Sequence, residues 1–210
     1  MLLLFALLTL VYAQPSLFER IRAFRPPPQR LPPLPFPEPY PPLTRSFTLI
    51  VGAPCSGKST YIDSLQYNTR MAYTVLSVDA LIDQVAGQLD WPVEHYPSFR
   101  PAADALLAQR LDAALRAGQP VLYETTGGDH AVRRLRRAML AARRANYSTN
   151  IVVMSGPTAR ISRCLKWRNQ QQHRQVLLET AQRLYFESQC NVPLLEALIS
   201  EGGWMMYKSV

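Results

Sequence analysis

Hydrophobic residues gather in five short runs along the chain, and longer amphipathic stretches separate these runs. Short apolar runs bounded by turn-forming residues are typical of strands that are buried on both faces of a sheet. The predicted strands are residues 47–51, 73–78, 121–124, 150–154 and 204–207. Because helical stretches alternate with these strands, the pattern predicts an α/β fold with a central, mainly parallel five-stranded sheet.

Helical spacing of apolar residues separates the strands. Leu107, Leu111 and Ala114 predict a helix over residues 101–117, which the sequence Gly-Gln-Pro then stops. Residues 88–101, which several prolines interrupt, are predicted to form a loop over the carboxyl edge of the sheet. Further helices are predicted to begin near residues 59 and 80 and to span residues 130–146, 158–168, 177–189 and 193–200.

The N-terminal region differs from the rest of the chain. Residues 1–13 form an apolar run that is shorter than the roughly 20 residues of a membrane-spanning helix, so no transmembrane helix is predicted. Small residues before Gln14 predict a cleaved signal peptide and entry into the secretory pathway. The alternative is a short hydrophobic N-terminal helix of a cytoplasmic protein. The sequon Asn146-Tyr147-Ser148 would be a glycosylation site only in the secretory case.

Proline dominates the segment that follows. Residues 14–45 are predicted to be a stiff linker, because prolines lack N–H groups and favour an extended polyproline conformation. Proline-rich segments also bind aromatic grooves, so a proline-motif-binding partner for residues 26–42 is the alternative interpretation. The folded domain is therefore predicted to span residues 46–210.

Residues 52–59 match the pattern G-x-x-x-x-G-K-[ST] of a phosphate-binding loop without substitution. The loop lies between the first predicted strand and a predicted helix, where backbone N–H groups and the helix dipole bind phosphate. Lys58 would then reach the β- and γ-phosphates of ATP, and Ser59 would bind Mg²⁺. The alternative is a glycine turn before an ordinary helix. The predicted nucleotide-binding residues are Gly52, Ala53, Pro54, Cys55, Ser56, Gly57, Lys58, Ser59 and Thr60.

Two carboxylates follow predicted strands. The carboxyl ends of parallel strands share one sheet edge with the phosphate-binding loop, so Asp79 is placed to accept a proton from an acceptor hydroxyl. Its alternative role is to cap the helix that begins at residue 80. Glu124, Thr125 and Thr126 are predicted to contact the acceptor. Their alternative role is to end a strand and cap the next helix.

Arginines mark two helices. Arg160, Arg163 and Arg168 would close over the phosphates as a lid and stabilise the charge of the transition state. The alternative is a surface helix with solvated arginines. The arginines of residues 130–146 are predicted to form a solvated face. Nucleic-acid binding through that face is the less favoured interpretation, because aromatic residues are not interleaved.

The composition limits the size of the core, the charge of the partner and the roles of the cysteines. The 210-residue chain is 48% hydrophobic, enough for one substantial core. Its formal net charge of +8, from 23 Lys and Arg against 15 Asp and Glu residues, favours an anionic partner or substrate. The cysteines, Cys55, Cys164 and Cys190, are odd in number and lack metal-ligand spacing. We therefore expect no disulfide framework and interpret Cys55 as a space-filling residue of the loop.

With the loop at residues 52–59, Asp79, the Glu124-Thr125-Thr126-Gly127 segment and the arginines from Arg160 onward, residues 47–207 resemble the zeta-toxin-like P-loop kinases. The chain is similar, more distantly, to polynucleotide kinases. The resemblance implies a three-layer P-loop NTPase fold and ATP- and Mg²⁺-dependent phosphorylation of a hydroxyl of a small metabolite or nucleotide sugar. The alternatives are a polynucleotide 5′-hydroxyl kinase and a non-catalytic nucleotide-binding interaction module. The last is motivated by Ile82 and Asp83, which lie where these kinases often carry an arginine.

Overall fold

A computed structural model of the chain describes residues 44–69, 71–89, 96–156, 158–171, 176–199, 203 and 205–209. The chain divides into two units, Met1–Pro41 and Pro42–Val210, and the described residues all belong to the second. The predicted signal peptide, the proline motif of residues 26–42 and nearly all of the predicted linker lie outside the described residues. Within the described part of the chain, no helix combines the length and the hydrophobicity that a bilayer span requires.

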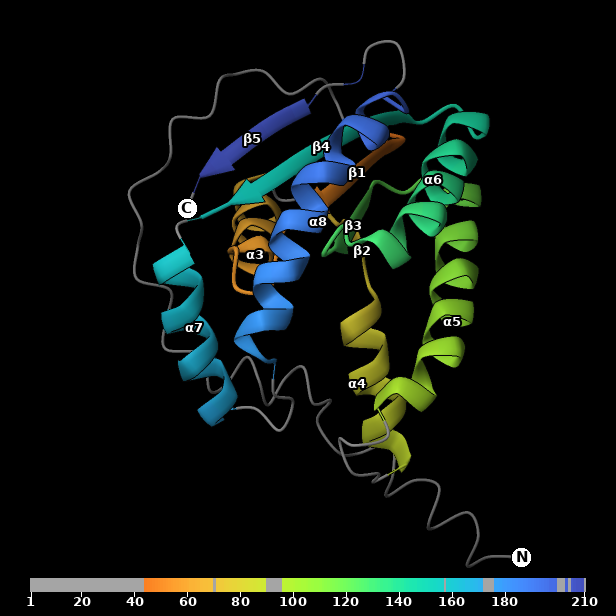
Figure 1. Ribbon diagram of the computed structural model, residues 1–210. Coiled ribbons are helices and arrows are strands. Elements are labelled where there is room, and N and C mark those ends of the chain that lie inside the picture. The colour runs from red at the N-terminus through yellow and green to blue at the C-terminus, as the bar shows by residue number, and fades with distance from the viewer. Residues whose placement is uncertain are drawn as a thin grey trace, which may run out of the picture. The chain divides into compact units, whose positions relative to one another are not determined.

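A five-stranded sheet forms the centre of the second unit (Figure 1). Every strand pair is parallel, and the spatial order is β2-β3-β1-β4-β5. The register pairs Val51 at the end of β1 with Thr125 of β3 and Val153 of β4. The predicted α/β class with a five-stranded parallel sheet is therefore confirmed. The strands are β1 (Ser46–Val51), β2 (Thr74–Ser77), β3 (Val121–Thr125), β4 (Ser148–Ser155) and β5 (Met205–Ser209).

Helices cover both faces of the sheet and give the three layers that the family resemblance implies (Figure 1). On one face, α3 (Lys58–Thr69) packs through buried Tyr61, Ile62 and Leu65 against Ile50 of β1 and neighbouring strand residues. On the other face, the core residues of β1 meet four helices. These helices are α4 (Val78–Leu89), α5 (Tyr96–Arg116), α6 (Asp129–Arg144) and α8 (Leu178–Glu196).

The alternation of strand side chains explains this arrangement. Successive residues of a strand point to opposite faces, so Leu49 and Val51 join the larger core while Ile50 joins the core under α3. All six residues of β1 are buried, because this strand is paired on both sides and covered on both faces. The apolar runs of the sequence thus hold the phosphate-binding loop at the centre of the sheet.

Helix boundaries differ most from the sequence prediction at the start of α5 and at the C-terminal helices. Helix α4 also includes Val78 of a predicted strand and residues 88–89 of the predicted loop. Helix α5 begins at Tyr96, so residues 96–100 of the predicted loop are helical, while residues 90–95 lie outside the described residues. Pro97 lies in the first turn, where an N–H group has no partner inside the helix, and buried Phe99 and Ala103 anchor the segment to the core.

The second difference is at the C-terminal helices, which the sequence predicts as two and the structure joins into α8. Helix α8 continues through Pro193 because Val192 and Leu195 on either side are buried in the main core. Burial of these side chains compensates for the single backbone hydrogen bond that the proline removes.

Candidate active site

The loop between β1 and α3 curls so that its backbone forms a small concavity. Cys55 has a φ of 64° and Gly57 a φ of 83°, both in the left-handed region. Alternation of right- and left-handed residues turns successive N–H groups toward one point, which is the geometry of an anion-binding nest. The N–H group of Gly52 donates to Thr125 O at 3.2 Å, and Ser56 N–H donates to Ala53 O at 3.2 Å. These bonds tie the loop to the end of β3 and close its first turn.

The position of Gly52 has no room for a larger side chain. A Cβ atom at this position would lie 2.5 Å from Ser56 Oγ and 2.6 Å from the backbone oxygen of Met154. The Ser56 hydroxyl could rotate away, but the backbone oxygen of Met154 is fixed in β4 and could not. The first glycine of the pattern therefore lets the loop pass close over the neighbouring strand.

Lys58 is the buried cation of the site, with 7% of its surface exposed. Its Nζ donates to the backbone oxygens of Gly52 at 2.8 Å and Ala53 at 2.9 Å. Burial lowers the pKa of Lys58 from its usual 10.5, since the charged form loses hydration. The negative charges of Glu124 and Asp79 raise this pKa in opposition, and the positive charge of Arg168 lowers it further. Lys58 thus lies within electrostatic reach of a base candidate, an acceptor candidate and a lid candidate.

Asp79 lies half-buried in the first turn of α4, directly after β2. The helix begins at Val78, and Ser77 Oγ accepts a hydrogen bond of 3.5 Å from the N–H group of Ala80. Ser77 makes this capping contact because it precedes the first helical residue. The alternative interpretation of Asp79 as the helix cap is therefore wrong.

Glu124 is half-buried near the end of β3, and its charge acts on Lys58. Thr125 is buried, with its Oγ1 accepting a 3.2 Å hydrogen bond from the N–H group of Gly127, so this hydroxyl holds the turn after β3. Thr126 is half-buried. The residue that precedes α6 is Gly128, which makes no side-chain capping bond, so the interpretation of the threonines as helix caps is wrong.

The three lid arginines differ in position on α7 (Thr158–Gln171). Arg160 and Arg163 are exposed. Arg168 is half-buried, and its charge reaches Lys58. Of the three, only Arg168 is therefore partly buried and acts electrostatically on Lys58, and the other two arginines face solvent.

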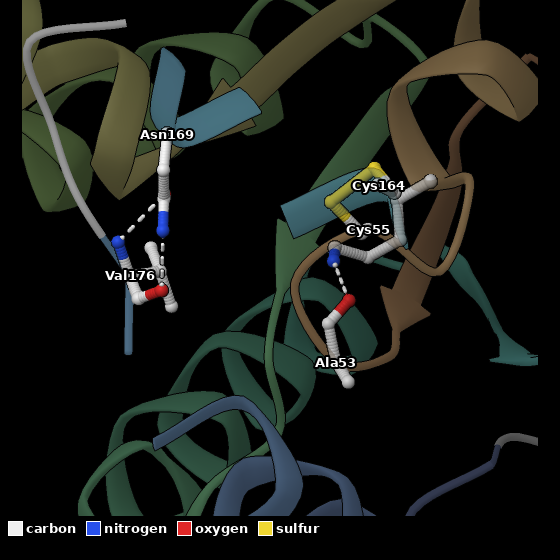
Figure 2. The surroundings of a disulfide bond; sticks show 6 residues. Ala53, Cys55, Cys164, Asn169 and Val176 are labelled. Carbon is white, nitrogen blue, oxygen red and sulfur yellow. Dashed lines mark hydrogen bonds between the residues drawn. A yellow bond between two sulfur atoms is a disulfide. The ribbon is translucent and has the colours of Figure 1, made fainter. Parts of the chain in front are cut away.

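A disulfide joins Cys55 of the loop to Cys164 of α7 (Figure 2). Cys190 is free and exposed. The sequence predicts no disulfide framework and a space-filling Cys55; the bond to Cys164 shows that this interpretation of Cys55 is wrong. The two cysteines are 109 residues apart in sequence, and only the packing of α7 against the loop brings their Cα atoms to 5.9 Å. Cys164 is thus a site residue that no local sequence signal could identify.

The loop fits a polyphosphate on observations other than its sequence pattern. Ser56 Oγ is buried without a hydrogen-bond partner, so an unused polar group lies inside the loop. Backbone N–H groups and Lys58 supply donors, and exposed Ser59 with the carboxylates of Asp79 and Glu124 supplies the oxygen ligands that Mg²⁺ prefers. Over the described residues there is no cluster of three or more His, Cys, Asp or Glu side chains suited to a metal ion.

A second polar cluster, which the sequence does not predict, lies between α5 and α6. Asp104 accepts hydrogen bonds from Arg100 at 3.3 Å and from Arg134 at 2.7 Å. Arg134 therefore pairs across helices, while Arg133 and Arg136 beside it are exposed, as the sequence predicts for this helix. The i and i+4 spacing of Arg100 and Asp104 is the sequence signal that could have indicated half of this cluster.

A strand, an anion-binding nest with a lysine and a following helix at the centre of a β2-β3-β1-β4-β5 parallel sheet define a P-loop NTPase. The family model described as "AAA domain" matches residues 47–193. The chain belongs to this family. No curated protein matches the chain in sequence.

Solved structures share the fold at low sequence identity. A protein described as a candidate kinase, from Chloroflexus aurantiacus J-10-fl, is 18% identical with a TM-score of 0.57, over 80% of this chain and 87% of that one. The PezAT chromosomal toxin-antitoxin system of Streptococcus pneumoniae gives 12% identity and a TM-score of 0.62, over 78% and 66% of the two chains. Shikimate kinase from Acinetobacter baumannii, in complex with shikimate, gives 14% identity and a TM-score of 0.50, over 79% and 85%. These likenesses show a kinase-like P-loop fold.

Proposed function

We propose that this protein is an ATP-dependent kinase that transfers the γ-phosphoryl group to a hydroxyl of a small metabolite or nucleotide sugar. One arrangement carries the proposal: the ends of β1, β2 and β3 lie side by side, so the loop with buried Lys58, the start of α4 and Glu124 share one sheet edge. The charges of three side chains act on the Lys58 ammonium there. They are Glu124 of β3, Asp79 of α4 and Arg168 of α7. A lysine, two carboxylates and an arginine at one sheet edge are the groups that phosphoryl transfer uses.

Each residue then has a chemical role. The backbone N–H groups of the loop and Lys58 would bind the β- and γ-phosphates, with the phosphates replacing the oxygens of Gly52 and Ala53 as acceptors for Lys58. Ser59 would hold Mg²⁺, which neutralises part of the phosphate charge when it is bound. Arg168 would stabilise the charge that develops on the transferred group.

Asp79 is proposed as the general base. The acceptor oxygen forms a bond to the γ-phosphorus while the bond from that phosphorus to the bridging oxygen of ADP breaks, and the hydroxyl proton passes to the carboxylate of Asp79. Glu124 would orient the acceptor at the same edge of the sheet. Thr126 remains a proposed acceptor contact, whereas the hydroxyl of Thr125 already serves the turn after β3.

The acceptor class rests on the resemblance to zeta-toxin-like kinases. The PezAT structure shares the fold over 78% of this chain, and shikimate kinase, which was solved with shikimate, shares it over 79%. The likeness to shikimate kinase supports a small acceptor over a nucleic-acid strand. The exposed arginines of α6 lie outside the group of charges around Lys58 and add no support for nucleic-acid binding.

The test uses full-length protein, γ-labelled ATP with Mg²⁺, and a panel of sugar nucleotides, small alcohols and a 5′-hydroxyl oligonucleotide. We expect label to move to one class of small acceptor. Asp79→Asn should lower kcat by about 10² or more while the affinity for ATP stays close to that of the wild type. The matched control is Asp83→Asn, one turn further along α4, which should behave as the wild type.

Three results would redirect the proposal. Transfer to the oligonucleotide alone would favour a polynucleotide kinase. Tight ATP binding without transfer to any acceptor would favour a non-catalytic interaction module. Loss of ATP binding along with turnover in Asp79→Asn would contradict the base role of this residue.

We further propose that the protein enters the secretory pathway. Disulfides persist in oxidising compartments, and the exposed sequon residue Asn146 is open to a glycan. Mass spectrometry of protein from its own host should find a mature N-terminus at Gln14 and a glycan on Asn146. An intact Met1 would contradict this proposal.

A further inference from the structure

The disulfide between Cys55 and Cys164 is a covalent link between two parts of the site, the phosphate-binding loop and α7. Cys55 belongs to the phosphate-binding loop, and Cys164 lies in the middle of α7 (Figure 2). Around this bond, Ala53 of the loop forms a small buried cluster with Ile161 and Leu165 of α7. The loop and the helix therefore meet through an apolar contact with a covalent bond at its side.

A second attachment holds the C-terminal end of the same helix. Asn169 Nδ2 donates to Val176 O at 2.9 Å, and Val176 N–H donates to Asn169 Oδ1 at 3.0 Å (Figure 2). Val176 is buried in the cluster that contains Ala53 and Leu165. Reciprocal bonds of this kind fix the end of α7 to the segment before α8. The disulfide at Cys164 and the hydrogen bonds of Asn169 thus hold α7 at two points, five residues apart.

Arg168 lies between these two attachments. It follows Cys164 by four residues, so both side chains lie on the same face of α7. Arg168 is half-buried and acts on Lys58, whereas Arg160 and Arg163 nearer the start of the helix are exposed. The position of Arg168 relative to the loop therefore depends on how α7 is held at Cys164.

We propose that Cys55 and Cys164 are positioning residues for Arg168, and that the disulfide holds this guanidinium over the phosphates of bound nucleotide. The inference rests on the proposed function and goes beyond it, because it makes phosphate contact by the lid arginine dependent on the oxidised state. A dithiol reductant would transfer two electrons and two protons to the sulfur–sulfur bond, and two thiols would form as the reductant becomes a disulfide. The loop would keep Lys58, and α7 would keep its apolar contact with Ala53, but Arg168 would be less tightly placed.

The experiment measures dissociation of a fluorescent ATP analogue in the presence of Mg²⁺, on full-length protein with and without dithiothreitol. We expect dissociation to accelerate by at least roughly fivefold on reduction, because a phosphate contact of Arg168 is weakened. Cys164→Ser should release the analogue at the fast rate under both conditions. Cys190→Ser removes the free, exposed cysteine and should keep the full response to dithiothreitol.

The variant Arg168→Ala distinguishes a disulfide that acts through Arg168 from one that only stabilises the fold. This variant keeps both cysteines, so it tests the proposal even if Cys164→Ser fails to fold. If the disulfide acts through Arg168, Arg168→Ala should release the analogue fast in both redox states and should show no further response to reduction. Lys166→Ala, which removes an exposed cation from the same helix, should keep the wild-type response. A redox response that survives Arg168→Ala overturns the proposal, as do equal rates for oxidised and reduced wild type.

Hydrogen exchange of the α7 amides separates this inference from the proposed function. Faster exchange at residues 161–171 after reduction supports the attachment of α7 by the disulfide, and unchanged exchange overturns it. Absence of analogue binding in both redox states contradicts the proposed function itself. The two failures are therefore distinguishable in one set of samples.

Discussion

Two buried serines show what a single hydroxyl contributes to this molecule. Ser56 in the loop has a buried Oγ without a hydrogen-bond partner, and Ser188 in α8 donates from its Oγ to Tyr185 O at 2.7 Å. An unpaired buried hydroxyl costs free energy, while a paired one contributes modestly. A stability cost inside a loop that fits phosphate is typical of a functional position.

We expect Ser56→Ala to leave the free energy of unfolding unchanged or to raise it by about 1 kcal/mol, because an unsatisfied group is removed. Ser188→Ala is the matched control, with a similar loss of volume, and should lower the free energy of unfolding by about 1 kcal/mol because a hydrogen bond is lost. Urea denaturation of both variants measures the difference. A lower stability for Ser56→Ala than for Ser188→Ala would contradict this account of the loop.

His130 gives a pH dependence at the residue scale. Burial lowers its pKa from 6.5, and the charges of Arg100 and Arg134 lower it further, while Glu187 acts in the opposite direction and Arg183 adds to the lowering. The unfolded chain then binds this proton more readily than the folded one. Stability therefore falls as the pH drops below about 6.5 and is retained above it.

The corresponding prediction compares wild type with His130→Gln at pH 7.5, 6.5 and 5.5. The variant should lose less stability than the wild type over this interval, because its side chain binds no proton. NMR titration of the His130 ring should give a pKa below 6.5. A ring pKa above 6.5, or an unchanged pH slope in the variant, would contradict the prediction.

At the scale of elements, α7 and the phosphate-binding loop form one linked unit. Two cysteines separated by 109 residues close a long loop of chain, and cross-links of that length restrict the unfolded state strongly. The apolar contact of Ala53 with Ile161 and Leu165 stabilises the same junction. The disulfide should therefore stabilise the whole fold as well as the site.

Removal of this cross-link should be costly. Under non-reducing conditions, Cys164→Ser should lower the free energy of unfolding by about 2–4 kcal/mol. Cys190→Ser should change it by less than about 0.5 kcal/mol, since Cys190 is exposed and free. Chemical denaturation with calorimetry measures both values. Equal stability of the two variants would show that the cross-link does not constrain the chain as described.

The sequence predicts helices and strands well where the hydrophobic pattern is strong. The apolar runs located all five strands, since a strand buried on both faces carries few polar residues. The prediction separated α8 into two helices, because the local effect of Pro193 is visible in sequence and the burial of Val192 and Leu195 is not. Local rules fail where tertiary packing outweighs them.

The sequence likewise predicts those parts of the candidate site that depend on a local motif or on strand order, and misses those that depend on packing. The phosphate-binding loop, Asp79 and Glu124 follow from a motif and from the parallel topology that aligns strand ends. The pairing of Cys55 with Cys164 was not predictable, since it depends on how α7 is placed over the loop. The same placement decides that Arg168 approaches Lys58 while Arg160 and Arg163 face solvent.

At the scale of the whole molecule, the sheet serves to bring distant side chains to one edge. Parallel pairing of β1 with β3 and β4 fixes the loop after β1, and the helices that follow β2 and β4 supply Asp79 and Arg168. Every proposed role depends on nucleotide in that loop. Calorimetric titration of the oxidised, full-length protein with Mg²⁺-ATP tests this dependence most directly.

We expect saturable binding to the wild type, an affinity at least roughly tenfold weaker for Lys58→Ala, and wild-type affinity for Lys166→Ala. Circular dichroism of the variants serves as the control that each is folded. Absence of binding to the wild type, or equal affinities for wild type and Lys58→Ala, would contradict the account.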